Sequence, residues 1–240
     1  MALVEICTGD PAGVEAALSG GAARVELCSG LAEGGLTPSA GAVRYASQRI
    51  HTNVLIRPRP GDFFYSQEEI DVMADDILQA RAMGAQGIVI GALLPDRSVD
   101  VDTCRRLIDL APGADLTFHR AFDLTSDPFD ALEKIIALGF RRILTSGLAP
   151  TALDGVEMIA ELHRRAAGRI LIMAGAGVNP ENASRILSLS NANELHASAR
   201  SRISPRYTSG DVAMGSDDDG RSRLATDPEI VASLVKHAAI

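Results

Sequence analysis

Residues 2–28, ALVEICTGDPAGVEAALSGGAARVELC, contain two short strand-like runs separated by a segment of helical period. The runs are ALVEIC at 2–7 and ARVELC at 23–28, and both alternate apolar with polar side chains. A period of two is typical of a strand, because successive side chains of a strand point to opposite faces. The stretch therefore predicts one strand–helix–strand unit.

The rest of the chain repeats this unit. Six more strand-like runs follow, NVLIRPR (53–59), QGIVIG (86–91), ADLTFH (114–119), RRILTS (141–146), RILIMAG (169–175) and NELHAS (193–198). Helix start signals stand between them: a capping box of Ser66 and Glu69, Asp127 before Pro128, and Asn179 before Pro180. Eight such units favour an α/β single-domain TIM-type (β/α)8 barrel over residues 1–240, because a doubly wound sheet usually has fewer strands.

The C-terminal part is predicted differently. Residues 201–226 are polar and rich in turn-forming residues, which predicts a long surface loop or flap. Residues 227–239 return to an apolar period and predict a closing helix. The DDDG sequence at 217–220 lacks the alternate spacing of a calcium loop, so we interpret it as a solvated acidic turn.

Composition excludes several classes of partner. The chain has 240 residues, a formal net charge of −8 and a pI near 5.1, which disfavours nucleic acid and anionic membrane surfaces. Its apolar runs are too short to cross a bilayer, and residues 1–10 do not resemble a targeting segment. The three cysteines form no C-x-x-C pair, so we expect reduced thiols and a cytoplasmic protein.

Strand alternation also predicts which side chains face the barrel interior. Val4 and Ile6 share one face of the first run, whereas Glu5 and Cys7 share the other. Because catalytic groups of TIM barrels gather at the carboxyl ends of the strands, the polar parity predicts one shared site there. Its members are Glu5, Cys7, Glu26, Cys28, Arg57, Arg59, His119 and His196.

Two alternatives to a functional site stay open. Buried carboxylates and guanidinium groups can simply neutralise one another in a barrel core.

The glycine-rich stretch AGAGVNPENA at 174–183 can hold an anion through Gly175, Gly177 and a helix amino end. It can equally be a tight turn that needs glycine only for its dihedral angles.

The lysines and histidines exclude two mechanisms. A Schiff base needs a lysine inside the barrel, but the two lysines, Lys134 and Lys236, fall in a helical segment and near the C-terminus. A zinc hydrolase of the His-x-His kind is not supported, because no such pair occurs in the sequence.

Two chemistries are left for the polar site. In the first, Glu5, Glu26, His119 and His196 serve as acid, base or cation-binding groups of an isomerase, lyase or epimerase. The groups expected to bind its small anionic or phosphorylated substrate are Arg57, Arg59, Asp62, Ser146, Gly175, Gly177 and Ser198. In the second, Cys7 and Cys28 end neighbouring strands with the same parity and form a soft ligand pair for Cu(I). Against the second, small cysteines are common in cores, and barrel stagger can separate equivalent positions.

Longer motifs resemble one known family. They are VEIC (4–7), RVELCSGLAEGGLTPS (24–39), IRPRPGDFFYS (56–66), TFHRAFD (117–123), RILTSG (142–147), MAGAGV (173–178), ELHAS (194–198) and VAMG (212–215). Together they resemble the CutC family of copper homeostasis proteins. The resemblance implies a TIM-type barrel, a cytoplasmic location, a homodimer or higher assembly, and Cys7 and Cys28 as Cu(I) ligands.

Three hypotheses follow for the function. The first is a cytoplasmic Cu(I)-binding protein of copper homeostasis, and the second is the enzyme on a small anionic substrate. The third is an inactive barrel that serves as a scaffold, which predicts a large apolar surface patch and no pocket of ligand size.

Overall fold

The computed structural model describes residues 2–204 and 223–239, and its centre is a closed barrel of eight parallel strands. The strands are β1 (Leu3–Thr8), β2 (Arg24–Leu27), β3 (Thr52–Leu55), β4 (Gly87–Ile90), β5 (Asp115–Phe118), β6 (Arg142–Thr145), β7 (Leu171–Ala174) and β8 (Glu194–Ala197). Each pairs with the next in chain order, and β8 pairs back with β1 to close the barrel. The predicted (β/α)8 barrel is confirmed, and each predicted run contains most or all of one strand.

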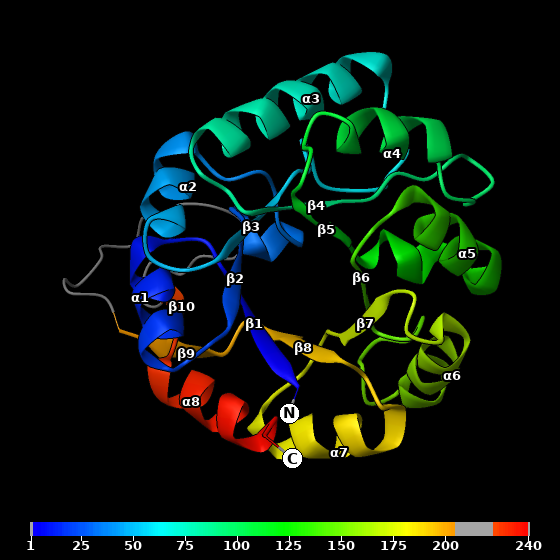
Figure 1. Ribbon diagram of the computed structural model, residues 1–240. Helices are drawn as coiled ribbons and strands as arrows, with labels where there is room; N and C mark the ends of the chain where they lie inside the picture. The colour runs from blue at the N-terminus through cyan, green and yellow to red at the C-terminus, as the bar shows by residue number, and fades with distance from the viewer. Residues whose placement is uncertain (1, 205–222, 240) are drawn as a thin grey trace, which may run out of the picture.

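Helices surround the barrel in a ring, as the view along its axis shows (Figure 1). They are α1 (Pro11–Ser19), α2 (Ala40–Ser47), α3 (Gln67–Ala82), α4 (Val101–Ile108), α5 (Pro128–Leu138), α6 (Val156–Ala166), α7 (Pro180–Ser190) and α8 (Pro228–His237). Two short 3-10 helices, η1 (Leu31–Glu33) and η2 (Arg120–Leu124), follow β2 and β5. Among the described residues, no helix is both long enough and apolar enough to span a bilayer.

Helix starts follow the predicted capping signals. Ser66 and Glu69 form a capping box at α3, and Asp127 caps α5 with Pro128 in its first turn. Asn179 caps α7 in the same way, with Pro180 in the first turn. These side chains accept hydrogen bonds from backbone N–H groups that have no partner inside the helix, which fixes where each helix begins.

The apolar parity of the strands faces the helices. Val4, Ile6, Val25 and Leu27 are buried in the large core cluster that also contains residues of the helices. The opposite parity faces the barrel axis, where Cys7, Cys28, Leu55 and Val89 form a small separate cluster. The alternation read from the sequence therefore separates the outer core from the barrel interior.

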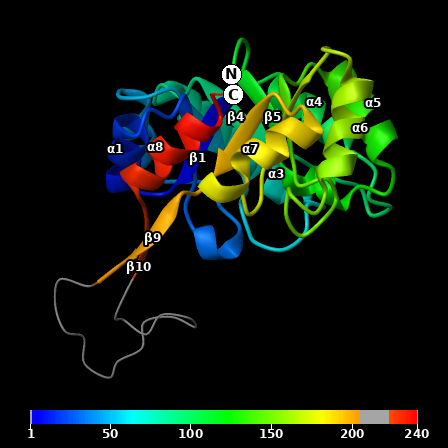
Figure 2. The ribbon, with the colours of Figure 1, turned by 90° about the horizontal axis from the view of Figure 1, so that it is seen from below.

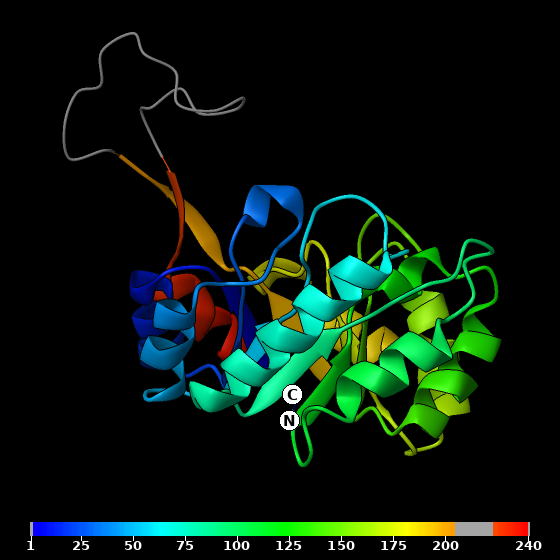
Figure 3. The same ribbon diagram turned by 90° about the horizontal axis from the view of Figure 1, so that it is seen from above.

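Two short strands lie at the two ends of the predicted loop at 201–226, whose residues 205–222 are outside the described part of the chain. β9 (Arg200–Ile203) and β10 (Arg223–Thr226) pair antiparallel between β8 and α8. Figures 2 and 3 show the hairpin projecting from the carboxyl end of the barrel, on the side opposite the chain termini. The predicted acidic turn at 217–219 and the motif at 212–215 lie outside the described residues. The predicted closing helix is confirmed as α8.

Candidate functional site

A network of buried charges fills the barrel interior near the amino ends of the strands. Parallel register sets Glu5 on β1 opposite Arg24 at the start of β2, and Arg24 Nε donates to Glu5 Oε2 at 2.5 Å. Arg24 also binds Glu194 at the start of β8. Arg142, at the start of β6, donates to Glu194 Oε2 at 2.8 Å and to Asp115 Oδ2 at 2.9 Å. The ionic network thus joins strands on opposite sides of the barrel.

This network favours the ionised form of two of its carboxylates, Glu5 and Asp115. Burial raises the pKa of Glu5, but Arg24 and His196 outweigh it and hold that pKa well below the ordinary value. Burial also raises the pKa of Asp115, but hydrogen bonds from His51 and Arg142 outweigh it and lower that pKa to about 2. Glu5, expected to be a catalytic group, is completely buried and held by ion pairs, which is the structural alternative raised by the sequence.

The thiol pair lies above this network, toward the carboxyl ends of the strands. Cys7 Sγ and Cys28 Sγ are 3.4 Å apart, and both residues are buried. This distance is far longer than a disulfide bond of about 2.05 Å, so both thiols are free. The register places Cys7 opposite Glu26, which is two residues before Cys28. The two sulfur atoms still meet, because both side chains have the inward parity.

The Cys7 thiol is neutral in the absence of a metal. The hydrogen bond with Cys28, burial and the nearby Glu26 carboxylate together raise the pKa of Cys7 well above its usual value. Metal binding to such a thiol releases a proton.

Glu26 and His196 complete this upper cluster. His196 Nδ1 lies 2.8 Å from Glu5 Oε1, and His196 Nε2 lies 3.7 Å from Glu26 Oε2. Burial lowers the pKa of His196, but the two carboxylates outweigh it and raise the pKa overall. Burial is also the main cause of the raised pKa of Glu26. Among the described residues, Cys7, Glu26 and His196 form a group whose potential metal-binding atoms all lie within 4.8 Å of one another.

His119 and Arg57 occupy another side of the mouth. His119 Nδ1 accepts a hydrogen bond from Ala121 N and so caps η2. His119 Nε2 is buried and has no hydrogen-bond partner among the residues that the structure describes. Burial and the Arg57 charge lower the pKa of His119 to about 3, which keeps the ring neutral at pH 7. The terminal nitrogens of Arg57 donate to the carbonyls of Glu33, Gly35 and Gly61. Arg57 Nε is buried, and the described part of the chain offers it no acceptor.

Arg59 and Asp62 do not join the mouth cluster. Arg59 donates to Glu69 on α3 and to Asp62, so both predicted residues belong to an ion-pair group at the start of α3. The alternation that placed Arg59 inside ends earlier than expected, because β3 stops at Leu55. Pro58 and Pro60 cannot donate the backbone hydrogen bonds that would continue the strand.

Ser146 follows β6 and is bound by its neighbours rather than directed at a ligand. Its hydroxyl donates to Ala149 O at 2.6 Å and lies 2.9 Å from Asp123 Oδ2. Arg120 donates to both Ser146 and Asp123. The polar residues at the end of TFHRAFD therefore bind the start of the loop after β6 to η2.

The glycine-rich segment after β7 has an internal explanation. A Cβ at Gly175 would lie 2.5 Å from Leu144 Cδ1 and 3.3 Å from His196 Cβ, so Gly175 permits close packing next to His196. Gly177 has a φ of +69°, which favours glycine. Asn179 and Asn182 cap each other at the start of α7, which favours the interpretation as a turn. Ser198 is half-buried directly after β8.

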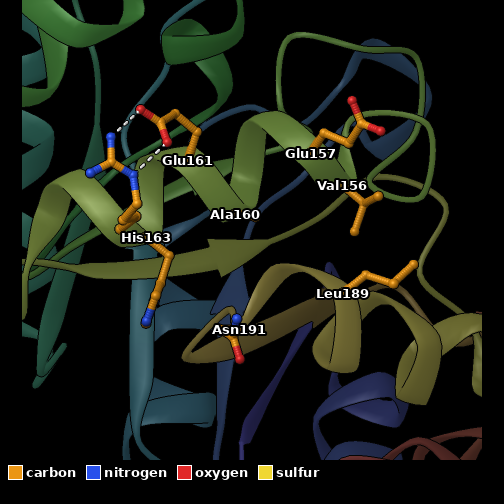
Figure 4. Close-up of a pocket in the computed structure, with 8 residues that line it drawn as sticks. Val156, Glu157, Ala160, Glu161, His163, Leu189 and Asn191 are labelled. Atoms are coloured by element: carbon orange, nitrogen blue, oxygen red, sulfur yellow. Dashed lines mark hydrogen bonds and ion pairs between the residues drawn. The ribbon is translucent and has the colours of Figure 1, made fainter.

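Two surface hollows lie in different places relative to the site. A cavity of about 240 Å³ opens beside the hairpin, and its walls include Thr8 and Ser29, the residues that directly follow the two cysteines. A larger cavity of about 660 Å³ lies on the outer layer between α6 and α7. Figure 4 shows Val156 and His163 directed toward Leu189 and Asn191, while Glu157 and Glu161 point to the other side of α6. The smaller hollow adjoins the carboxyl ends of β1 and β2, so it is relevant to the thiol pair.

Sequence reasoning missed most of the ionic network. Its unpredicted members are Arg24, Asn53, Asp115, Thr117, Arg142 and Glu194. The available signal was a charged or polar residue at or near the first position of a strand, with the same parity as the predicted site. In the sixth run this signal is Arg142, the second residue of the run and the first residue of β6.

Fold and site together define a class of protein. It is a TIM barrel with a buried ionic network near the amino ends of its strands and a cluster of thiol, carboxylate and imidazole groups at their carboxyl ends. Comparison with known proteins specifies the class further. The model of the CutC family matches residues 2–201, and the chain belongs to this family.

Individual relatives agree with this assignment. A family protein CutC of Porphyromonas gingivalis is 46% identical over 98% of this chain and 96% of its own length. The copper homeostasis protein cutC homolog of Mus musculus is 46% identical over 89% of this chain and 80% of its own length. A solved CutC structure from Streptococcus agalactiae is 34% identical, has a TM-score of 0.79, and covers 82% of this chain and 99% of that one.

Proposed function

We propose that this chain is a Cu(I)-binding protein of copper homeostasis and that Cys7 and Cys28 are its ligands. The observation that carries the proposal is the 3.4 Å separation of the two free sulfur atoms. Two thiolates are a soft donor set of the kind that selects Cu(I). The mouse relative's name supports a role in copper homeostasis.

Location and assembly are part of the same proposal. The three free cysteines suit the reducing cytoplasm, where thiols persist without forming disulfides. A homodimer or higher oligomer follows from the family resemblance. The acidic net charge supports a metal ion or small ligand as the partner rather than nucleic acid.

An anaerobic competition titration of Cu(I) against a chromophoric chelator tests the thiol pair. We expect the reduced wild-type chain to bind one equivalent and the double variant Cys7→Ser/Cys28→Ser to bind none, because a hydroxyl is a poor ligand for Cu(I). Cys104→Ser is the matched control, since Cys104 is a buried thiol in α4, where burial raises its pKa to about 12. Stoichiometric Cu(I) binding by the folded double variant would reject the proposal.

A second function is favoured by the two unpartnered donors at the mouth. With Nδ1 accepting from Ala121, the neutral ring of His119 carries its proton on Nε2, a buried donor with no acceptor among the described residues. Arg57 Nε is a second such donor, and the Phe63 ring packs against both side chains. Leaving buried donors unpaired costs free energy, which an oxygen of a carboxylate or phosphate would recover.

This arrangement suits an enzyme of the isomerase, lyase or epimerase class. A neutral histidine N–H beside an arginine can polarise a carbonyl group or hold an anionic group of a small substrate. Glu26, whose pKa is raised by burial, is a more suitable proton donor or acceptor than Glu5, which is fixed by ion pairs. The proposal therefore retains His119, Arg57 and Glu26 and gives Glu5 a supporting role.

Titration with inorganic phosphate, followed by nitrogen-15 NMR of the histidine rings, tests this second function. We expect saturable shifts of the His119 Nε2 signal with millimolar affinity and unchanged signals from His163 on the outer layer. His119→Asn keeps an acceptor for Ala121 N but removes the Nε2 donor, and should weaken phosphate binding about tenfold, as expected for one lost hydrogen bond to a charged group. An unshifted His119 signal at saturating phosphate and acetate would contradict the anion site.

A further inference from the structure

The thiol pair is part of a larger set of donors. Cys28 Sγ lies 3.4 Å from Cys7 Sγ, and the potential metal-binding atoms of Cys7, Glu26 and His196 lie within 4.8 Å of one another. The set therefore contains two sulfur atoms, one carboxylate oxygen and one imidazole nitrogen. Two cysteines alone would not require the other two groups to gather here.

His196 is held in the orientation of a metal ligand. Its Nδ1 is 2.8 Å from Glu5 Oε1, which leaves Nε2 facing the Glu26 carboxylate at 3.7 Å. Glu5 is fixed in turn by Arg24 Nε at 2.5 Å and by Asn53 Nδ2 at 3.1 Å. A carboxylate that orients the far nitrogen of a histidine is the usual support of a metal-binding imidazole.

Two of the donor separations already match those around one small tetrahedral ion. Bonds of about 2.0–2.3 Å at tetrahedral angles place neighbouring donor atoms about 3.3–3.8 Å apart. The two measured separations of 3.4 Å and 3.7 Å fall in this range. Cys7, Glu26 and His196 lie within 4.8 Å of one another, so a modest side-chain adjustment brings them onto one ion. Cys28 contacts this group through Cys7, and its sulfur must turn toward Glu26 and His196 when the ion binds.

The chemistry of the donors selects the ion. Cu(I) favours sulfur ligands alone, whereas a set of sulfur, nitrogen and carboxylate oxygen suits a borderline divalent ion. Two thiolates and one carboxylate also supply the negative charge that a buried divalent ion needs. The ionic network next to the site holds Glu5, and Glu5 in turn orients His196.

We propose that Cys7, Cys28, Glu26 and His196 together bind one Zn²⁺ ion at the carboxyl end of β1, β2 and β8. The inference shares its two thiols with the proposed Cu(I) site and rests on their being accessible to a metal. Glu26 and His196 then decide the preference, since they add affinity for Zn²⁺ and little for Cu(I). The barrel therefore discriminates between the two ions by which of its donors it uses.

X-ray absorption of the wild-type chain loaded with Zn²⁺ alone gives a test that needs no variant. The expected spectrum has two sulfur and two nitrogen or oxygen neighbours at tetrahedral distances. A coordination shell without sulfur, or one equivalent of Zn²⁺ that fails to bind at all, would overturn the inference.

Chelator competition with Zn²⁺ and with Cu(I) then separates this site from the thiol pair. We expect Glu26→Gln and His196→Gln each to weaken Zn²⁺ binding about 100-fold while Cu(I) affinity changes less than tenfold. Glu157→Gln and His163→Gln, the same substitutions in the outer cavity of Figure 4, should change neither affinity. Circular dichroism of each variant confirms folding before the titration.

The results distinguish the two proposals. Retained Zn²⁺ affinity in both folded variants would overturn the four-ligand site and leave the Cu(I) proposal standing. Zn²⁺ binding that depends on all four residues, without any Cu(I) binding, would support the four-ligand site and overturn the Cu(I) proposal.

Discussion

Arg142→Met is expected to destabilise the protein by about 3–5 kcal/mol, because it removes one partner of a buried ionic network. The Arg142 side chain is 2% exposed and donates to Glu194, Asp115 and Thr117. After the substitution, Arg24 is the one ion-pair partner of Glu194 left among residues 2–204 and 223–239. The barrel interior then holds excess negative charge that is shielded from solvent. The free energy of unfolding from urea titration measures the loss, which corresponds to about 10 °C in melting temperature.

The preceding residue offers a matched control for this prediction. Arg141 contacts the same carboxylate, with Nε 3.6 Å from Asp115 Oδ1, but its side chain is 66% exposed. Arg141→Met should therefore change stability by less than about 1 kcal/mol, as is usual for an exposed ion pair. Equal losses in the two variants would show that burial of the network does not set its importance.

Gly147→Ala is expected to cost about 3 kcal/mol, because it combines backbone strain with a steric clash. Gly147 has a φ of +71°, and a Cβ there would lie 2.2 Å from the Gly155 carbonyl oxygen. That oxygen belongs to backbone at the start of α6, so it cannot move aside as a flexible side chain would. The loop that holds Ser146 would have to shift, and chemical denaturation measures the resulting loss of stability.

Gly113→Ala separates the two contributions. Gly113 has the same φ of +71°, but nothing lies within 4 Å of a Cβ built there. We expect this variant to lose only about 1 kcal/mol, the cost of the left-handed conformation alone. If Gly147→Ala loses no more than Gly113→Ala, the clash with Gly155 is relieved without cost and the prediction is wrong.

The fold could be predicted because its signals are local and repeated. Alternation in each strand-like run and caps such as Ser66 and Asp127 depend on neighbours within a few residues, which the sequence displays directly. The same alternation correctly brought Cys7 and Cys28 to one side, and the structure confirms that their sulfur atoms meet.

The candidate site could be predicted only in part because its partners are set by closure of the barrel. Arg24 meets Glu194 across 170 positions of sequence, a pairing that depends on β8 lying beside β1 in a definite register. Arg59 was predicted to face the barrel interior on the assumption that the strand continues to this residue. The strand β3 ends at Leu55, and Pro58 and Pro60 do not allow it to continue. Local patterns thus identified faces of strands, whereas side-chain partners required the three-dimensional register.

The buried ionic network also determines how the protein responds to dissolved salt and to redesign of its exterior. Surface ion pairs such as Arg169–Glu133 and Arg164–Glu161 are in contact with solvent. Dissolved counterions weaken their attraction, with a screening length of about 10 Å at moderate ionic strength. Charges sealed between Arg24, Arg142 and their carboxylates are shielded from those counterions. The surface charges can therefore be substituted to change solubility, while the buried ion pairs that connect strands across the barrel keep their strength.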